Sequence, residues 1–288
     1  MEENNNATPQ QPPLYIVTGA TDSMGSVIAR RLAKQGKPLL LASRDIDKAE
    51  RFAETLRSEN RHLDIQSLQL DLSSFALVKD FATRLKGLGR PVYALVNNAG
   101  TLPRHSRISP DGYEHTVQVN FLSTALLSLL VYPLMPENGR IILSTSLSRR
   151  LVSLPYEFPA VSNFTQIGSY AQAKLALTLF SIYMSTTMKT RRVNVNCVNP
   201  GVINSSVLAL HRWIERAPDY ITNPFPNPES GITPTMRALE SNDTGFIFQG
   251  NSGQMKTSSL LKNRDVFIKL CNDTMRILKK HLPDDQTL

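Results

Sequence analysis

Apolar residues occur along the chain in short runs that alternate with longer amphipathic segments. The runs are rich in Val, Ile and Leu and lie at residues 14–18, 38–42, 65–70, 92–96, 140–145 and 193–198. Helical spacing of apolar side chains predicts helices between them, at residues 24–35, 46–58, 74–86, 112–135 and 169–188. Strands that alternate with helices are typical of βαβ units. The pattern therefore predicts an α/β fold: a single Rossmann-like, doubly wound parallel sheet with helices on both faces.

The two ends of the chain and one internal stretch depart from this pattern. Residues 1–13 are polar, with no Lys or Arg and no apolar run, which predicts a disordered tail rather than a signal peptide. Residues 204–233 are rich in Pro, Asn and Ser, and a loop of that length is usually a lid or an insert. A short helix at 235–240, an edge strand at 244–249 and a closing helix at 261–281 are expected after it. We thus expect one domain over residues 14–288, with a substrate lid at about 204–233.

Composition narrows the possible partners. The 288 residues include 32 Lys and Arg against 24 Asp and Glu, a formal charge of +8. The basic residues form no long run, which favours a solvated surface over a nucleic-acid partner. Two cysteines are too few for a disulfide framework, and no Cys/His cluster offers a metal site. The apolar stretch 125–135 is too short to cross a bilayer, so we expect no membrane insertion and a cytoplasmic protein.

The first strand runs directly into a turn with two glycines, Thr18-Gly19-Ala20-Thr21-Asp22-Ser23-Met24-Gly25. Glycine lets the backbone approach a pyrophosphate, and the free N–H groups of the next helix attract the anion. Gly19 and Gly25 are therefore candidate cofactor residues. An ordinary strand-to-helix turn is the alternative, because a turn with two glycines is a weak motif.

The second strand ends at Ala42-Ser43-Arg44-Asp45, close to where NAD enzymes carry an acidic residue that binds the ribose 2′-hydroxyl. The guanidinium of Arg44 suits a 2′-phosphate instead, which favours NADP(H) over NAD(H) as the cofactor. The carboxylates of Asp22 and Asp45 argue the other way if they point toward the same phosphate.

Polar groups that can do chemistry follow the central strands. Tyr170 and Lys174 are one helical turn apart, so the phenol and the ammonium share a helix face. The fifth strand ends in Ser144-Thr145-Ser146 and the fourth in Asn97-Asn98-Ala99-Gly100, and Asn120 lies in the next helix. Because open α/β sheets bind ligands at the carboxyl ends of their strands, we expect these groups to converge there.

In this order the motifs resemble the short-chain dehydrogenase/reductase family, from about Leu14 to the C-terminus. Their details look most like its NADP-dependent carbonyl reductase and retinol-dehydrogenase-like branch. The matching features also include Asp71-Leu72 after the third strand and Pro200-Gly201 after the sixth. The resemblance implies an oxidoreductase that interconverts a ketone or aldehyde and an alcohol by hydride transfer.

The resemblance also implies a catalytic set of Asn120, Ser146, Tyr170 and Lys174. Tyr170 would be the general acid or base, with its pKa lowered by Lys174 and the nicotinamide, and Ser146 would hydrogen-bond the substrate oxygen. Lys174 would also hold the ribose hydroxyls, and Asn120 would position a water for proton relay. The residues implied to line the cofactor are Gly19, Thr21, Ser23, Met24, Gly25, Arg44, Asp71, Leu72, Asn97, Ala99, Gly100, Tyr170, Lys174, Pro200, Gly201 and Val202.

Ser23 is a departure from the family, which has glycine at this position of the turn. A Cβ there would crowd the pyrophosphate or shift the turn. This departure keeps a second class of function open, a non-catalytic or weakly active nucleotide-binding regulator or scaffold on the same fold.

The loops expected to face the substrate are 101–111, 147–169 and 204–233. The first two carry several cations beside apolar residues, and these are Arg104, His105, Arg107, Arg149 and Arg150. One hypothesis is a small-molecule carbonyl or alcohol substrate that is apolar with an anionic end, but the pattern favours solvated arginines that do not touch the ligand. The helices at 112–135 and 169–188 are long enough to leave an apolar face for self-association as a homodimer or homotetramer, and a monomer is the alternative.

Overall fold

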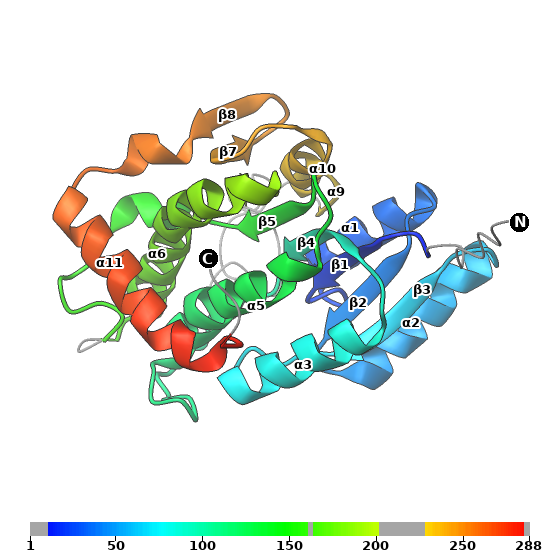
Figure 1. Cartoon of the computed structure of the whole chain (residues 1–288), viewed down its shortest axis with the longest axis horizontal. Coiled ribbons are helices and arrows are strands. Elements are labelled where there is room, and N and C mark those ends of the chain that lie inside the picture. Colours follow the sequence, from blue (N-terminus) through cyan, green and yellow to red (C-terminus); the bar gives the residue numbers. More distant parts are fainter. Residues whose placement is uncertain (1–10, 161–163, 202–227, 285–288) are drawn as a thin grey trace, which may run out of the picture.

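The computed structural model describes residues 11–160, 164–201 and 228–284 of the chain. These residues form one eight-stranded sheet in the order β3-β2-β1-β4-β5-β6-β7-β8 (Figure 1). Neighbouring strands run parallel except β7 and β8, which pair antiparallel. The strands are β1 (Leu14–Thr18), β2 (Leu39–Ser43), β3 (Ile65–Gln69), β4 (Val92–Asn97), β5 (Arg140–Ser144), β6 (Asn194–Asn199), β7 (Phe246–Gln249) and β8 (Gly253–Lys256). The chain reverses direction across the sheet between β1 and β4, and a doubly wound sheet opens its ligand crevice at this switch point.

Helices cover both faces of the sheet. They are α1 (Ser23–Lys34), α2 (Ile46–Glu59), α3 (Phe75–Gly87), α4 (His115–Val117), α5 (Ser123–Val131), α6 (Gln166–Thr187), α9 (Pro228–Gly231), α10 (Thr233–Glu240) and α11 (Arg264–Leu278). On one face α3, α5, α6 and α11 pack over strand residues such as Ile16, and on the other α1, α2 and α10 pack over residues such as Val17. Neighbouring strand positions thus point into opposite cores. Burial on both faces explains why the strands read as continuous apolar runs.

The helix expected at 112–135 starts later and is not a regular α-helix. It begins at His115, widens into a π-helical turn, η1 (Gln118–Leu122), continues as α5 and ends in a 3-10 turn, η2 (Tyr132–Leu134). The carboxylate of Glu114 caps its start by accepting the N–H groups of Thr116 at 2.9 Å and Val117 at 3.2 Å. The cap explains why the helix begins at His115 instead of Gly112.

A buried glutamine side chain links the π-helical turn to the loop before it. Gln118 is fully buried, and its Nε2 donates to Asp111 Oδ2 at 3.1 Å and to Ser123 Oγ at 2.9 Å. Its Oε1 accepts the hydroxyl of Ser109 at 3.3 Å. These bonds fix the widened turn that contains Asn120.

The expectation that the strand at 244–249 forms the sheet edge is wrong. β8 lies outside β7 and pairs with it from Phe246 opposite Lys256 to Gln249 opposite Gly253. Its sequence, Gly-Gln-Met-Lys, has little strand propensity, so the apolar pattern does not reveal it.

Of the two helices expected to carry self-association, α5 is covered within the chain, whereas α6 exposes Ile167. Every α5 side chain is buried except Leu130, which is half-buried, and α11 packs on α6. The helical segment His115–Leu134 has 20 residues and could cross a membrane by length and composition, but 83% of its most apolar window is buried in the protein. The apolar stretch 125–135 is thus only part of a longer helical segment of the core.

Parts of the expected tail and lid lie outside the described residues. These are residues 1–10 of the tail and residues 204–227 of the lid. Within the described part, the carbonyl of Pro12 accepts a hydrogen bond from Arg90 Nη2 at 2.6 Å. The last residues of the expected lid region belong to α9 and the start of α10.

Candidate active site

The turn between β1 and α1 brings two glycines so close that no side chain fits between them. Gly19 has a φ of +62°, in the left-handed region that favours glycine. A Cβ on Gly25 would lie 2.0 Å from the carbonyl oxygen of Gly19, and one on Gly19 would lie 3.1 Å from Cα of Ala99. The side chain of Asp22 makes no capping hydrogen bond to the first turn of the 12-residue α1. This tight turn at a helix N-terminus fits a pyrophosphate.

Thr18, at the end of β1, joins this turn to the loop after β4. Its Oγ1 accepts the N–H groups of Asn98 at 3.0 Å and Ala99 at 2.9 Å, and Asn98 Nδ2 donates to its carbonyl oxygen at 3.1 Å. Thr18 is fully buried, so these bonds are shielded from water. The two loops therefore form one continuous rim at the switch point.

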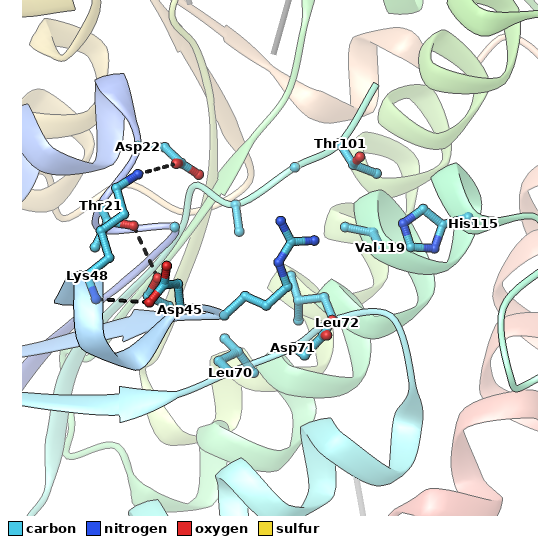
Figure 2. Close-up of a pocket in the computed structure, with 15 residues that line it drawn as sticks. Thr21, Asp22, Asp45, Lys48, Leu70, Asp71, Leu72, Thr101, His115 and Val119 are labelled. Atoms are coloured by element: carbon cyan, nitrogen blue, oxygen red, sulfur yellow. Dashed lines mark hydrogen bonds and ion pairs between the residues drawn. The ribbon is translucent and has the colours of Figure 1, made fainter. Parts of the chain in front are cut away.

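A pocket of about 260 Å³ opens beside this rim. Seven residues expected at the cofactor line it, namely Gly19, Thr21, Arg44, Asp71, Leu72, Ala99 and Gly100. Figure 2 shows Asp22, Asp45 and Lys48 on one side of the pocket, and Thr101, Val119 and His115 on the opposite side. A pocket lined by Gly19, Arg44 and Asp71 fits the adenosine end of a dinucleotide.

The two carboxylates that argue against a 2′-phosphate are both engaged by other groups. Asp45 Oδ1 accepts the N–H of Lys48 at 2.9 Å and so caps α2. Asp22 Oδ1 lies 3.6 Å from Lys48 Nζ, an ion pair exposed to solvent on both sides. The hydroxyls of Thr21 and Ser43 lie 3.1 Å apart at the same end of the pocket.

Four pocket residues were missed by the sequence interpretation: Lys48, Leu70, His115 and Val119. His115 and Val119 are four residues apart, a spacing that places both on one helix face and could have pointed to them. Burial and the nearby Arg107 lower the pKa of His115, whereas Asp71 raises it. Arg107 Nη2 lies 2.8 Å from His115 Nε2, so the arginine donates and the imidazole accepts.

Ser146 and Tyr170 meet at the carboxyl end of β5. Ser146 caps the 3-10 turn η3 (Leu147–Leu151), and its Oγ accepts the N–H of Ser148 at 3.3 Å and the hydroxyl of Ser148 at 3.0 Å. It also forms a side-chain hydrogen bond with Tyr170. Thr165 caps α6 by accepting the N–H of Gly168, so Tyr170 lies just beyond the first turn of that helix.

Asn120 and Lys174 complete a continuous cluster. Both amide atoms of the buried Asn120 bind the backbone of Thr101, with Oδ1 accepting at 2.9 Å and Nδ2 donating at 2.7 Å. Lys174 Nζ lies 5.7 Å from the centroid of the Tyr170 ring. A Cβ on Gly100 would lie 2.7 Å from Asn120 Oδ1 and 3.6 Å from Lys174 Nζ. The structure therefore gathers the four residues of the implied catalytic set at one place.

Burial sets the protonation of this cluster. It raises the pKa of Tyr170 to about 12, and the hydrogen bond with Ser146 offsets this only in part. The direction is the opposite of the lowering expected from the sequence, because desolvation of the phenolate dominates in the chain itself. Burial also lowers the pKa of Lys174 to about 8, and its Nζ donates to the carbonyl of Ser144 at 2.9 Å. At neutral pH Tyr170 is a protonated phenol, the form a proton donor needs.

Other expected cofactor residues lie around the pocket or beyond the described residues. Asn97 is 3% exposed and donates to Ser128 Oγ on α5, so its side chain points into the helix layer. Met24 packs against the core on the α1 face. Pro200 and Gly201 follow β6, with Gly201 at a φ of +83°. Val202 lies outside the described residues, and the effect of the Ser23 side chain stays a prediction.

The loop cations separate into two groups. Arg104, His105, Arg107 and Arg150 are exposed, which agrees with solvated loop residues. Arg149 is only 2% exposed. Its guanidinium donates to the carbonyl oxygen of Ser146 at 2.6 Å. The sequence does not distinguish these neighbouring arginines.

We expect Gly25→Ala to weaken cofactor binding, because the new Cβ would collide with the Gly19 carbonyl. Overpacking of this kind costs about 1–3 kcal/mol, which corresponds to a rise of roughly tenfold in the Kd for NADPH. Fluorescence titration with NADPH measures the change. Gly87→Ala is the matched control, since nothing lies within 4 Å of a Cβ at that position. Equal affinities for NADPH in the two variants would contradict the assignment of the turn.

Comparison with known proteins places this arrangement in a family. The family model described as short chain dehydrogenase matches residues 14–213. Polyprenol dehydrogenase of Mus musculus is 31% identical over 234 residues, which cover 77% of this chain and 70% of that protein. Retinol dehydrogenase 13 of Homo sapiens is 31% identical over 198 residues, 67% of this chain and 59% of that protein.

Solved structures share the fold. A short-chain dehydrogenase from Sphingobium yanoikuyae in complex with NADPH superimposes with a TM-score of 0.64 at 19% identity, covering 96% of this chain and 98% of that one. The RhlG/NADP active-site complex of Pseudomonas aeruginosa gives 0.65 at 23% identity, over 83% and 95% of the two chains. Fold, motifs and matches agree, and the chain belongs to the short-chain dehydrogenase family of oxidoreductases.

Proposed function

We propose that this protein is an NADP(H)-dependent oxidoreductase that interconverts a carbonyl and an alcohol, with Tyr170 as the general acid or base. The observation that carries the proposal is the continuous cluster of Asn120, Ser146, Tyr170 and Lys174 beside the pocket at the switch point. No observation on the described residues favours the alternative of a non-catalytic nucleotide-binding protein.

The chain's own residues would handle the proton and the developing charge. NADPH, when bound, supplies the hydride that adds to the carbonyl carbon. The Tyr170 hydroxyl gives its proton to the carbonyl oxygen as that oxygen gains negative charge, and the phenolate is then reprotonated from solvent. Because Ser148 donates to Ser146 Oγ through both its N–H and its hydroxyl, the Ser146 proton is directed at Tyr170, and a bound substrate oxygen would accept it in place of the phenol. In alcohol oxidation the same groups act in reverse.

The preference for NADP(H) rests on charge at the pocket end near α2. Arg44 and Lys48 both line this end, while Asp45 caps the helix and Asp22 is paired with Lys48. A 2′-phosphate would take the place of Asp22 at Lys48 and accept hydrogen bonds from Arg44. NAD(H) has a neutral 2′-hydroxyl at this position, which offers no negative charge to either cation.

For the substrate we propose an apolar alcohol or its carbonyl counterpart. Relatives named polyprenol dehydrogenase and retinol dehydrogenase support this class. The turn and loop after Ser146 also expose apolar side chains, with Leu151 76% and Tyr156 63% exposed. An anionic end on the substrate, a homo-oligomer, the absence of membrane insertion and a cytoplasmic location stay predictions.

Tyr170→Phe tests the proposed mechanism. Removing the hydroxyl deletes the proton donor, and we expect kcat to fall by about 10²–10⁴-fold while the Kd for NADPH stays within a factor of about two. The assay follows NADPH at its absorbance maximum with a panel of aldehydes and ketones that includes retinal and polyprenal. Tyr183→Phe, in the same helix, serves as the control. Wild-type turnover in Tyr170→Phe would falsify the mechanism.

Arg44→Ala and Lys48→Ala test the cofactor preference. Loss of hydrogen bonds from a charged group to a phosphate costs about 1.5–3 kcal/mol, so we expect Arg44→Ala to raise the Kd for NADP⁺ roughly 10- to 100-fold. Lys48 is half-exposed, and its removal should raise that Kd by about 2- to 5-fold. The Kd for NAD⁺ should change little in either variant.

Isothermal titration calorimetry with both nucleotides measures these effects. Arg51→Ala, an exposed arginine of α2 that does not line the pocket, is the control. Parallel losses for NADP⁺ and NAD⁺ in Arg44→Ala would contradict a role in binding the 2′-phosphate.

A further inference from the structure

Arg149 is a buried cation with unused hydrogen-bonding capacity directly behind Ser146. It is 2% exposed, and its Nη1 donates to the Ser146 carbonyl oxygen at 2.6 Å. Its Nε and Nη2 are buried and have no hydrogen-bond partner among the residues that the structure describes. The buried Arg90 and Arg140 are better satisfied, since each leaves only Nε without a partner.

Neighbouring groups locate the guanidinium on the α6 side of the sheet. Cys197 of β6 is fully buried, and its thiol donates to Ser181 Oγ of α6 at 3.3 Å. Arg149 and Lys174 both act on this thiol, each lowering its pKa, although burial raises that pKa overall to about 11. Arg149 and Lys174 are thus two buried cations that both act on Cys197, and Lys174 belongs to the catalytic cluster.

No anion balances Arg149 in the part of the chain that the structure describes. None of the ion pairs formed by the described residues includes Arg149. A buried guanidinium without a counter-charge is costly, and it is retained where negative charge develops nearby. In the proposed reaction, negative charge develops on Tyr170, which forms a side-chain hydrogen bond with Ser146, and on the substrate oxygen, which Ser146 would bind.

We propose that Arg149 is a positioning residue for this reaction: it holds the Ser146 turn by its carbonyl and directs positive potential at the charge that develops on Tyr170 and the substrate oxygen. The proposal rests on the proposed function, because it needs Tyr170 to become negatively charged. The proposal assigns different roles to two adjacent arginines, since Arg149 is buried against the Ser146 carbonyl and Arg150 is exposed.

Three variants separate charge from hydrogen bonding. Arg149→Gln keeps a donor for the Ser146 carbonyl and loses the charge, Arg149→Lys keeps the charge, and Arg150→Gln is the exposed control. In each, a trifluorinated tyrosine replaces Tyr170, because its phenol titrates several pH units below that of tyrosine. Its pKa is read by fluorine NMR as a function of pH in the complex with NADP⁺. Lys174 and Cys197 also face this region and are present in every variant.

We expect Arg149→Gln to raise the pKa of the fluorinated phenol by about one unit, because a nearby cation stabilises the phenolate. Arg149→Lys should shift it by less than half as much, and Arg150→Gln should not shift it. The Kd for NADPH should stay within about twofold in all three. In the same variants with an unmodified Tyr170, kcat for retinol oxidation is measured against pH. The apparent pKa on the acidic side of this profile should rise by the same amount as the pKa of the fluorinated phenol.

An unchanged pKa in a folded Arg149→Gln protein, verified by its Tm, would overturn the proposal and leave Arg149 a structural role only. If Arg149→Gln does not fold, Arg149→Lys decides instead. This variant keeps the positive charge, so a rise of a full unit in the pKa of the fluorinated phenol would overturn the proposal. The titration needs no turnover, so its outcome is independent of Tyr170→Phe. Failure of the proposed function would appear as activity in Tyr170→Phe, whatever the titration gives.

Discussion

The site depends on the junction that Thr18 makes between β1 and the loop after β4. The connections from these two strands leave in opposite directions, so a crevice opens between them. Three hydrogen bonds with Thr18 join the loops on its two sides. Gly19 rests against Ala99 on one side of this junction, and Gly100 rests against Asn120 on the other. The phosphate turn and the catalytic cluster are thereby held in fixed relation to each other.

Both ends of the crevice carry positive charge that is not balanced by a buried carboxylate among the described residues. At the nucleotide end Arg44 has no carboxylate partner among the described residues, and Lys48 has only an exposed pair with Asp22. At the catalytic end Lys174 and Arg149 are buried. Each end thus favours an anion, which in the proposed function is the 2′-phosphate of the cofactor at one end and the oxyanion of the reaction at the other.

Much of the fold and the outline of the site could be predicted from the sequence. Each predicted strand lies within a residue or two of the observed one, because burial on both faces makes strands into apolar runs. The π-helical turn could not be predicted, since it depends on Gln118 meeting side chains of a preceding loop. The protonation of Tyr170 and the burial of Arg149 depend on how deeply each group is packed, which local sequence does not encode.

The helical segment His115–Leu134 affects how the newly synthesised chain behaves before it folds. It is long and apolar enough to cross a membrane by length and composition, and its neighbours in the fold bury 83% of its most apolar window. During synthesis its 20 residues emerge before β5, β6 and α6, which complete that cover. A newly synthesised chain therefore exposes an apolar helix that is prone to aggregation until the C-terminal half of the chain folds over it. Slow synthesis or truncation after residue 134 would favour aggregation over assembly.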